Sequence, residues 1–245
     1  MSIPGRTHWL STPLGRYVSE WEAQRADQML ADVFGFNAVQ LGLPQIDLLR
    51  ANRITLRAHA DETGIVDVRC DPQQLPFASA SLDLVVLPHV LEFHGHPHQV
   101  LREVERVLIP EGRLLVLGFN PFSLWGLRRR LPGCPPDYPF NGRYLGVARL
   151  KDWLALLNMD VERGHFGCYA PPVSRLKNIA RFAWMEKAGD RWWPIGGGVY
   201  MIRAVKRVPG MRLMLPGWKR GAVRRKSLAP VLPTQPSSHA RRKND

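Results

Sequence analysis

Length, composition and charge limit what this chain can be. It has 245 residues, 45% of them hydrophobic, which is enough to bury the core of one ordinary domain with appendages. No stretch approaches eighteen consecutive apolar residues, and the N-terminus lacks the apolar run of a secretory signal, which argues against export and membrane spanning. We therefore expect a cytoplasmic protein. Three widely spaced cysteines argue against a disulfide framework and a CxxC metal site, so we interpret them as free thiols: Cys70, Cys134 and Cys168.

The net charge of +13 is concentrated near the C-terminus. Residues 216–245 hold eight Lys or Arg against one Asp, which leaves about +7 in that segment. The segment is also rich in Pro and Ser and has no apolar periodicity, a composition typical of disorder. Such a tail attracts nucleic acid or an anionic surface through a nonspecific, salt-sensitive field. A solubilising tail with no dedicated partner is the alternative.

The first predicted element is a helix. Thr12 followed by Pro13 is typical of a helix N-cap and first turn, and apolar residues recur at helical spacing as far as Leu30. Seven short apolar runs follow, and the first five lack strict alternation, which is typical of strands covered on both faces of a parallel sheet. These runs are residues 37–43, 54–60, 65–70, 82–88, 113–119, 160–169 and 197–207.

Two further helices and one long loop are predicted between these strands. A helix begins at Pro97 and presents apolar residues every three or four positions, and Pro110 with Gly112 is expected to stop it before the next strand. A second helix is expected over residues 148–157. Residues 131–146 contain four prolines and no regular pattern, so we expect a loop large enough to cover a cleft.

A group of motifs lies between Asp71 and Asn120. It contains Leu75-Pro76-Phe77, then Asp83 at the start of a strand, then "RVLIPEG" from Arg106 to Gly112 at the end of a helix. Together these resemble the class I S-adenosylmethionine-dependent methyltransferases, particularly the type-11 methyltransferase domain. A weaker resemblance covers residues 37–207.

The resemblance implies a fold and a domain organisation. The fold class is α/β, a doubly wound, seven-stranded, mostly parallel sheet (the Rossmann-like methyltransferase fold) with an antiparallel last strand. We expect an N-terminal helical extension over residues 1–36, the methyltransferase-like domain over 37–208, and a basic, disordered tail over 209–245.

The cofactor implied by the resemblance is S-adenosyl-L-methionine. Ligands of doubly wound sheets bind outside the carboxyl ends of the strands. In the family, the acid after the third strand accepts a hydrogen bond from the adenine amino group, and here that acid is Asp71. Alternatively, Asp71 before Pro72 simply opens a turn. The residues expected to line the cofactor site are Gln40, Gly42, His59, Asp71, Pro72, Leu87 and Pro88.

The turn after the first predicted strand departs from the family pattern D/E-x-G-x-G-x-G. Only Gly42 of the three glycines is present, Gln40 replaces the acid, and Pro44 suggests a different path for the backbone. Missing glycines count more against a dinucleotide, whose pyrophosphate must approach the backbone closely, than against S-adenosylmethionine. Gln40 can still hydrogen-bond the amino acid portion of the cofactor. For the ribose hydroxyls, either His59 or Asp61 could replace the expected acid.

The candidate catalytic residues are His89 and Glu92, which follow the fourth predicted strand. An imidazole near neutral pH can accept a proton if the acceptor needs a general base, although His89 could be an ordinary loop or cap residue. Asn120 is a candidate substrate contact, with a turn and helix start as its alternative. His94, His96 and His98 alternate along the chain, but Gly and Pro between them indicate an irregular loop, and we expect no metal site.

The predicted function is therefore S-adenosylmethionine-dependent methyl transfer to a small-molecule acceptor. Positioning of the reactants supplies most of the rate acceleration in such a displacement. The loop Pro132 to Pro139 is expected to cover the acceptor, and Trp192-Trp193-Pro194 either lines the substrate pocket or packs on the sheet. The alternative is a non-catalytic binding or regulatory protein on the same fold, which contacts nucleic acid or anionic surfaces through its tail.

Overall fold

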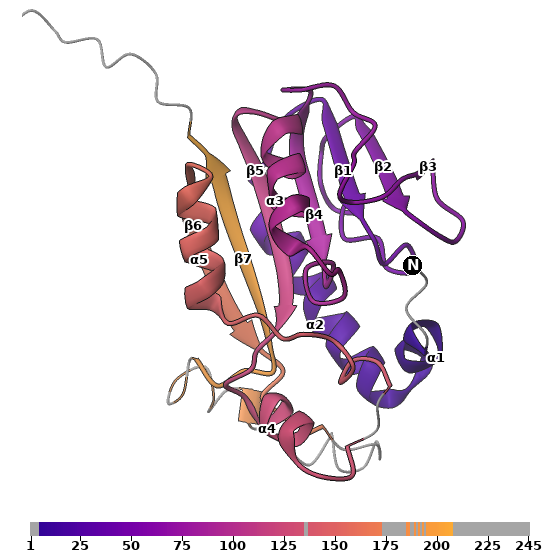
Figure 1. The fold of residues 1–245 in the computed structure, drawn as a ribbon, viewed down its shortest axis with the longest axis vertical. Coiled ribbons are helices and arrows are strands. Elements are labelled where there is room, and N and C mark those ends of the chain that lie inside the picture. Colours follow the sequence, from indigo (N-terminus) through magenta and orange to yellow (C-terminus); the bar gives the residue numbers. More distant parts are fainter. Residues whose placement is uncertain are drawn as a thin grey trace, which may run out of the picture. The chain divides into compact units, whose positions relative to one another are not determined.

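A seven-stranded sheet is the centre of the molecule (Figure 1). The computed structural model describes residues 5–134, 137–172, 185, 186, 189, 191, 193 and 195–207. The strand order is β3-β2-β1-β4-β5-β7-β6, and β7 runs antiparallel to both of its neighbours. This confirms the predicted fold class. The strands are β1 (Asn37–Leu41), β2 (Leu56–Asp61), β3 (Val68–Arg69), β4 (Leu82–Pro88), β5 (Leu108–Phe119), β6 (Met159–Gly167) and β7 (Val199–Lys206).

Five helices with defined bounds accompany the sheet in the part of the chain that the structure describes. They are α1 (Arg6–Ser11), α2 (Pro13–Leu30), α3 (Pro97–Val107), α4 (Leu124–Arg130) and α5 (Val147–Leu156). Helix α2 begins as predicted, because the Thr12 hydroxyl accepts a hydrogen bond from the Gly15 N–H at 3.1 Å. Among these helices, none is long and apolar enough to cross a bilayer.

Strand β5 begins earlier than the sequence indicates. We expected Pro110 and Gly112 to separate α3 from the strand, but β5 starts at Leu108, directly after α3. Leu82 pairs with Leu108, and the next pair on β4 is Leu84 with Arg113, so the residues between are accommodated by a register irregularity. An irregularity of this kind tolerates a proline that has no N–H to donate, and it explains the difference.

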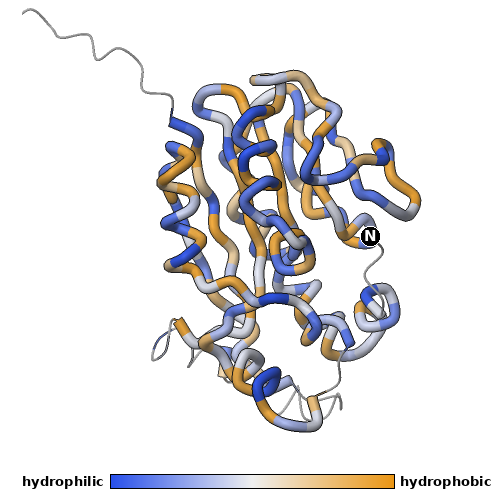
Figure 2. The backbone as a smooth tube through the Cα atoms, viewed as in Figure 1, coloured by the Kyte–Doolittle hydropathy of each residue, from blue (hydrophilic) through white to orange (hydrophobic). Residues whose placement is uncertain are grey.

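Apolar residues pack on both faces of the sheet, and hydrophobic colour runs along its central strands in Figure 2. One face packs on α3 and α5, which lie in front of the sheet in Figure 1. The other face packs on α2, which contributes Ala26, Met29 and Leu30 to a cluster with strand residues such as Leu84 and Leu115. The described residues contain no helix between β1 and β4. Helix α2 therefore covers part of the sheet that a helix after β1 would otherwise cover.

Candidate functional site

The carboxyl ends of β1, β2 and β4 surround a small hollow. Its volume is about 20 Å³, about the size that one water molecule needs. We call it the strand-end hollow. It is lined by Arg6, Gly42, Leu43, Asp61, Glu62, Pro72, Pro88, His89, Val90, His94 and Tyr138. Gly42, Pro72 and Pro88, which the sequence analysis assigned to the cofactor site, are among these lining residues.

Two residues that the sequence did not connect meet in this hollow. Arg6, in the first turn of α1, donates from Nη2 to Oδ2 of Asp61 at 2.9 Å. Their side chains are only 12% and 11% exposed. Asp61 is the last residue of β2 and also accepts a hydrogen bond from the Glu62 N–H at 2.7 Å. The acid at the end of the second strand is thus already bound to a cation of the same chain.

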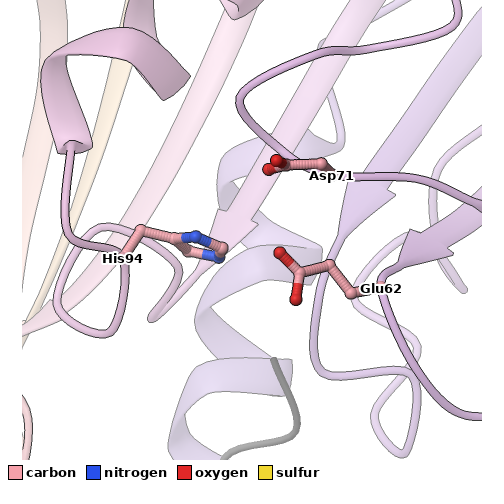
Figure 3. A group of neighbouring side chains, drawn as sticks. All are labelled: Glu62, Asp71 and His94. Atoms are coloured by element: carbon pink, nitrogen blue, oxygen red, sulfur yellow. The ribbon is translucent and has the colours of Figure 1, made fainter.

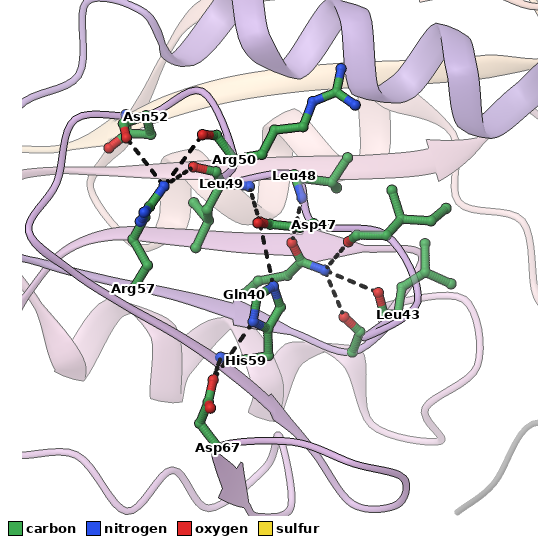
Figure 4. Close-up of polar contacts among 12 residues, drawn as sticks. Gln40, Leu43, Asp47, Leu48, Leu49, Arg50, Asn52, Arg57, His59 and Asp67 are labelled. Atoms are coloured by element: carbon green, nitrogen blue, oxygen red, sulfur yellow. Dashed lines mark hydrogen bonds and ion pairs between the residues drawn. The ribbon is translucent and has the colours of Figure 1, made fainter.

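His59 does not line the hollow, although the sequence analysis placed it there. Its ring nitrogens lie 3.5 Å from Asp47 and 3.6 Å from Asp67 (Figure 4), and the lining of the hollow does not include it. His59 is two residues before the end of β2, and the position at the strand end belongs to Asp61. Leu87 is fully buried in the apolar core beneath α3, and the hollow's lining does not include it.

Gln40 holds the turn after β1 (Figure 4). Its buried amide nitrogen faces the carbonyl oxygens of Gly42, Leu43 and Ile46 at 3.2, 3.1 and 2.8 Å. Its amide oxygen accepts from the Leu48 N–H at 2.9 Å. Gly42 and Leu43 both have left-handed φ values, 80° and 52°. The two N–H groups of the amide point among these three carbonyls and its oxygen accepts from an N–H, whereas a carboxylate can only accept. The buried Gln40 side chain therefore holds the turn, and its N–H groups are used there.

A buried acid–imidazole–acid group lies beside the hollow. The Nε2 atom of His89 is 2.6 Å from Oε1 of Glu22, and Nδ1 is 3.1 Å from Oε2 of Glu92. The other Glu92 oxygen accepts from the Phe119 N–H, and the His89 ring stacks on Phe119 at 4.2 Å. We call Glu22, His89 and Glu92 the buried triad.

The protonation of His89 does not support its predicted role. Burial alone would lower the pKa of His89, but the two carboxylates outweigh burial and raise it from 6.5 to about 10. The imidazole is therefore protonated at neutral pH and cannot accept a proton. Glu92 is equally buried, with both oxygens engaged. Glu22 was missed, although it is a charged residue four positions after Val18 and four before Ala26, on the apolar face of α2.

Asn120 connects two parts of the backbone and is not free to contact a substrate. Its amide nitrogen donates to the carbonyls of Ile195 and Gly197 at 2.7 and 2.9 Å, and its oxygen accepts from the Phe122 N–H at 3.0 Å. The sequence alternative, a turn leading into a helix, is confirmed, because Ser123 is the N-cap of α4.

Asp71 opens a turn and faces two other titratable side chains (Figure 3). Its carboxylate accepts from the Gln73 N–H at 2.8 Å. One ligand atom each from Glu62, Asp71 and His94 lies within 4.8 Å of the others. Burial lowers the pKa of His94. These residues come from the loops after β2, β3 and β4, so Asp71 stands at the rim of the hollow.

The three neighbouring histidines do not converge. The ring of His98 packs on Trp153 with centroids 3.7 Å apart, and His96 is the N-cap residue of α3 without a side-chain cap bond. The irregular loop that the sequence predicts is confirmed at this point.

A second cavity lies beside α4. Its volume is about 450 Å³, and we call it the α4 groove. Phe122 and Trp193 are 71% and 70% exposed on it, which is unusual for large apolar side chains. Among the described residues that line the α4 groove, Arg130 is the charged one. The lining comprises Pro121, Phe122, Ser123, Leu124, Leu127, Arg130, Tyr169, Met185, Gly189, Trp193 and Gly196. Of the predicted aromatic lining, Trp192 and Pro194 lie outside the described residues.

The strand order, the antiparallel β7 and the strand-end hollow define the class I methyltransferase fold. Residues 34–116 match the family model described as "Methyltransferase domain". Residues 34–116 thus resemble the methyltransferase domain family, and the strand order around them is that of the Rossmann-like methyltransferase fold.

Two curated proteins are similar to this chain, and one of them has no stated activity. The chain is 34% identical to the uncharacterized protein YafS of Escherichia coli over 62% of this chain and 65% of that protein. It is 35% identical to a malonyl-[acyl-carrier protein] O-methyltransferase of Laribacter hongkongensis over 39% of this chain and 34% of that enzyme. The chain thus spans less than two thirds of either relative.

A solved structure gives the same fold. It is an S-adenosylmethionine-dependent methyltransferase of Thermotoga maritima, which superposes with a TM-score of 0.56 at 16% identity, over 82% of this chain and 94% of that one.

S-adenosylmethionine does not fit the strand-end hollow in this conformation. Sites for ligands of that size have volumes of roughly 300 to 1,000 Å³, against about 20 Å³ here. Arg6 and Tyr138 take up the space next to Asp61. The acids that the resemblance assigns to the cofactor, Asp61 and Asp71, lie at the hollow, but the hollow is too small for the cofactor.

Proposed function

We propose that the protein is an S-adenosylmethionine-dependent methyltransferase that acts on an apolar small molecule. The observation that carries the proposal is the match of residues 34–116 to a methyltransferase domain, folded so that Gly42 and Asp61 line one hollow at the strand ends and Asp71 lies within 4.8 Å of its lining residue Glu62. The cofactor would supply the methyl group. The residues of this chain would bind and orient the two reactants.

The α4 groove supports an apolar acceptor. Its volume of about 450 Å³ falls in the range of small-molecule sites, and its walls are mainly apolar. It opens at the edge of the sheet where methyl acceptors would meet the cofactor, because Pro121 follows β5 and Gly196 precedes β7. Arg130 at the groove favours an acceptor that also carries an anionic group.

Calorimetry with S-adenosylmethionine tests the proposed activity at its first step. We expect saturable binding with a dissociation constant in the micromolar range. Asp71→Ala should weaken the affinity at least tenfold, because the adenine amino group would lose its carboxylate acceptor. Asp152→Ala removes an equally exposed acid from α5 and should leave the affinity unchanged. Absence of heat from the full chain at millimolar ligand would contradict the proposal.

Binding of an apolar anion tests the groove separately. With 1-anilinonaphthalene-8-sulfonate as the probe, we expect Leu127→Asp to weaken binding about tenfold or more, since it places a carboxylate in an apolar wall. Leu156→Asp is the matched control, because Leu156 is 82% exposed on α5 and away from the groove. Equal probe affinity of the two variants would exclude the groove as the binding site.

A non-catalytic binding protein on the same fold is the second candidate. The commitment of Gln40 to the turn and the small volume of the strand-end hollow favour it. In that case residues 216–245, which lie outside the described residues, would supply contact with nucleic acid or an anionic surface. The calorimetry above separates the two candidates.

A further inference from the structure

The strand-end hollow is small because the N-terminal segment lies against it. Arg6 projects from α1 and pairs with Asp61, the acid that the fold places at the end of β2. The hydroxyls of a ribose would have to share these carboxylate oxygens with the guanidinium, and the hollow of about 20 Å³ leaves no space for a ribose while Arg6 is in place. The chain itself therefore takes the position that an adenosyl ligand needs.

Helix α1 and Tyr138 close the hollow together. The rings of Trp9 and Tyr138 are 5.1 Å apart, and Trp9 also contacts Phe119 and Trp125 at 6.3 and 6.5 Å. Tyr138 is one of the residues that line the hollow. A movement of α1 that withdraws Arg6 also removes one of the rings that pack on Tyr138, which keeps its stacking contact with Phe93 at 5.0 Å.

The chain has a break at which α1 can separate from α2. Thr12 has φ −72° and ψ 158°, an extended conformation typical of a residue that precedes proline. Helix α1 has six residues, too few to be stable without its contacts. Helix α2, by contrast, is held by Met29 and Leu30 in the core and by Glu22 in the buried triad. Departure of α1 therefore leaves α2 and the sheet in place.

Gly15 allows the close approach of the two helices. A Cβ atom on Gly15 would lie 2.1 Å from the Trp9 carbonyl oxygen and 2.8 Å from the Leu10 Cα. These are backbone atoms of α1, so a larger residue can be accommodated only if α1 moves. Alanine favours the helical conformation of α2 more than glycine does. Gly15→Ala thus displaces α1 without changing any residue of the hollow.

We propose that the segment Gly5–Ser11 is an autoinhibitory lid over the cofactor site, which binds an adenosyl ligand only after Arg6 leaves Asp61. The inference rests on the proposed function. The apparent affinity then equals the affinity of the open state reduced by the fraction of molecules that are open. Any change that weakens the lid raises the apparent affinity.

Calorimetry of the full chain with S-adenosylhomocysteine tests the lid. We expect Arg6→Ala and Gly15→Ala each to bind about tenfold more tightly or better than the wild type, because each raises the open fraction. Arg16→Ala removes a charge from an exposed position of α2 and should bind like the wild type.

The possible outcomes separate the lid from the proposed function. Saturable binding with equal affinity in the wild type, Arg6→Ala and Gly15→Ala would overturn the lid and leave the methyltransferase proposal standing. Absence of binding in all of them would overturn both. As a readout without ligand, amide hydrogen exchange in α1 should be faster in Gly15→Ala than in Arg16→Ala, with α2 unchanged after its first turn. Unchanged exchange in α1 would also overturn the lid.

Discussion

Replacement of His89 by Asn is expected to lower the free energy of unfolding by about 3 to 5 kcal/mol at pH 7, the range for breaking a buried ion pair. His89 is the cation between Glu22 and Glu92, and all three side chains are nearly inaccessible to water. Without it, two buried carboxylates face each other across the gap. Asparagine is the appropriate replacement because His89 has a left-handed φ of 55°, which Asn tolerates better than most residues.

The pH dependence gives this prediction its sign. The pKa of His89 is raised from 6.5 to about 10 in the folded protein, so the unfolded state loses its proton first as pH rises. The stabilisation from the protonated ring is fully present below pH 6.5 and is lost as pH approaches 10. The difference in unfolding free energy between wild type and His89→Asn should therefore shrink between pH 7 and pH 10.

Denaturant unfolding of the two proteins at several pH values measures both effects. Glu22→Gln is the control, because its amide oxygen can still accept from Nε2 of His89 while Glu92 remains as a counter-charge. We expect it to cost about 1 to 2 kcal/mol, the scale of one altered hydrogen bond. If His89→Asn lowered the free energy of unfolding by less than about 3 kcal/mol, the buried ring would not be protonated. The same would follow if the difference in unfolding free energy from the wild type did not change with pH.

The elements were predictable because their signals are local. Seven apolar runs correspond to the seven strands, and Thr12-Pro13 marks the start of α2 as expected. The one clear displacement, the start of β5 at Leu108, arises from pairing with Leu82 of β4. A proline such as Pro110 normally ends a helix or strand, but a register irregularity tolerates it. The sequence alone does not show that pairing with β4 produces such an irregularity.

The site was less predictable because its residues meet through the fold. The rule for doubly wound sheets pointed to the carboxyl ends of the strands, and Gly42, Pro72 and Pro88 line the hollow there. Either His59 or Asp61 could stand at the end of β2, where the residue for the ribose hydroxyls is expected. The sequence does not fix the last residue of β2, which the structure places at Asp61. Arg6 comes from α1, which lies in the predicted N-terminal helical extension but before the one helix that the sequence analysis began at Thr12-Pro13.

The buried triad and the lid relate to each other through α2. Glu22 fixes α2 against His89, directly beside the strand-end hollow that Arg6 closes from α1. The fixed helix and the detachable one are separated by Thr12. Under the lid proposal, α1 can therefore leave the hollow while Glu22 keeps α2 in place.

Restoration of the family's acid at position 40 is expected to damage this protein. We expect Gln40→Glu to lower the free energy of unfolding by about 3 to 5 kcal/mol, the cost of leaving a buried charge unpaired. The carboxylate would face the carbonyl oxygens of Gly42, Leu43 and Ile46, to which the amide now donates. Only the Leu48 N–H would remain as a donor.

Gln40→Met separates the charge from the lost hydrogen bonds. Methionine fills a similar volume without a charge, and the turn would lose its amide contacts, at about 1 to 3 kcal/mol for unsatisfied buried groups. Denaturant unfolding at pH 7 should therefore rank the wild type above Gln40→Met and Gln40→Met above Gln40→Glu. Calorimetry with S-adenosylhomocysteine should give no gain in affinity for Gln40→Glu. A stable Gln40→Glu protein with tighter binding would mean that the turn can rebuild around an acid, and that Gln40 is not what fixes its path.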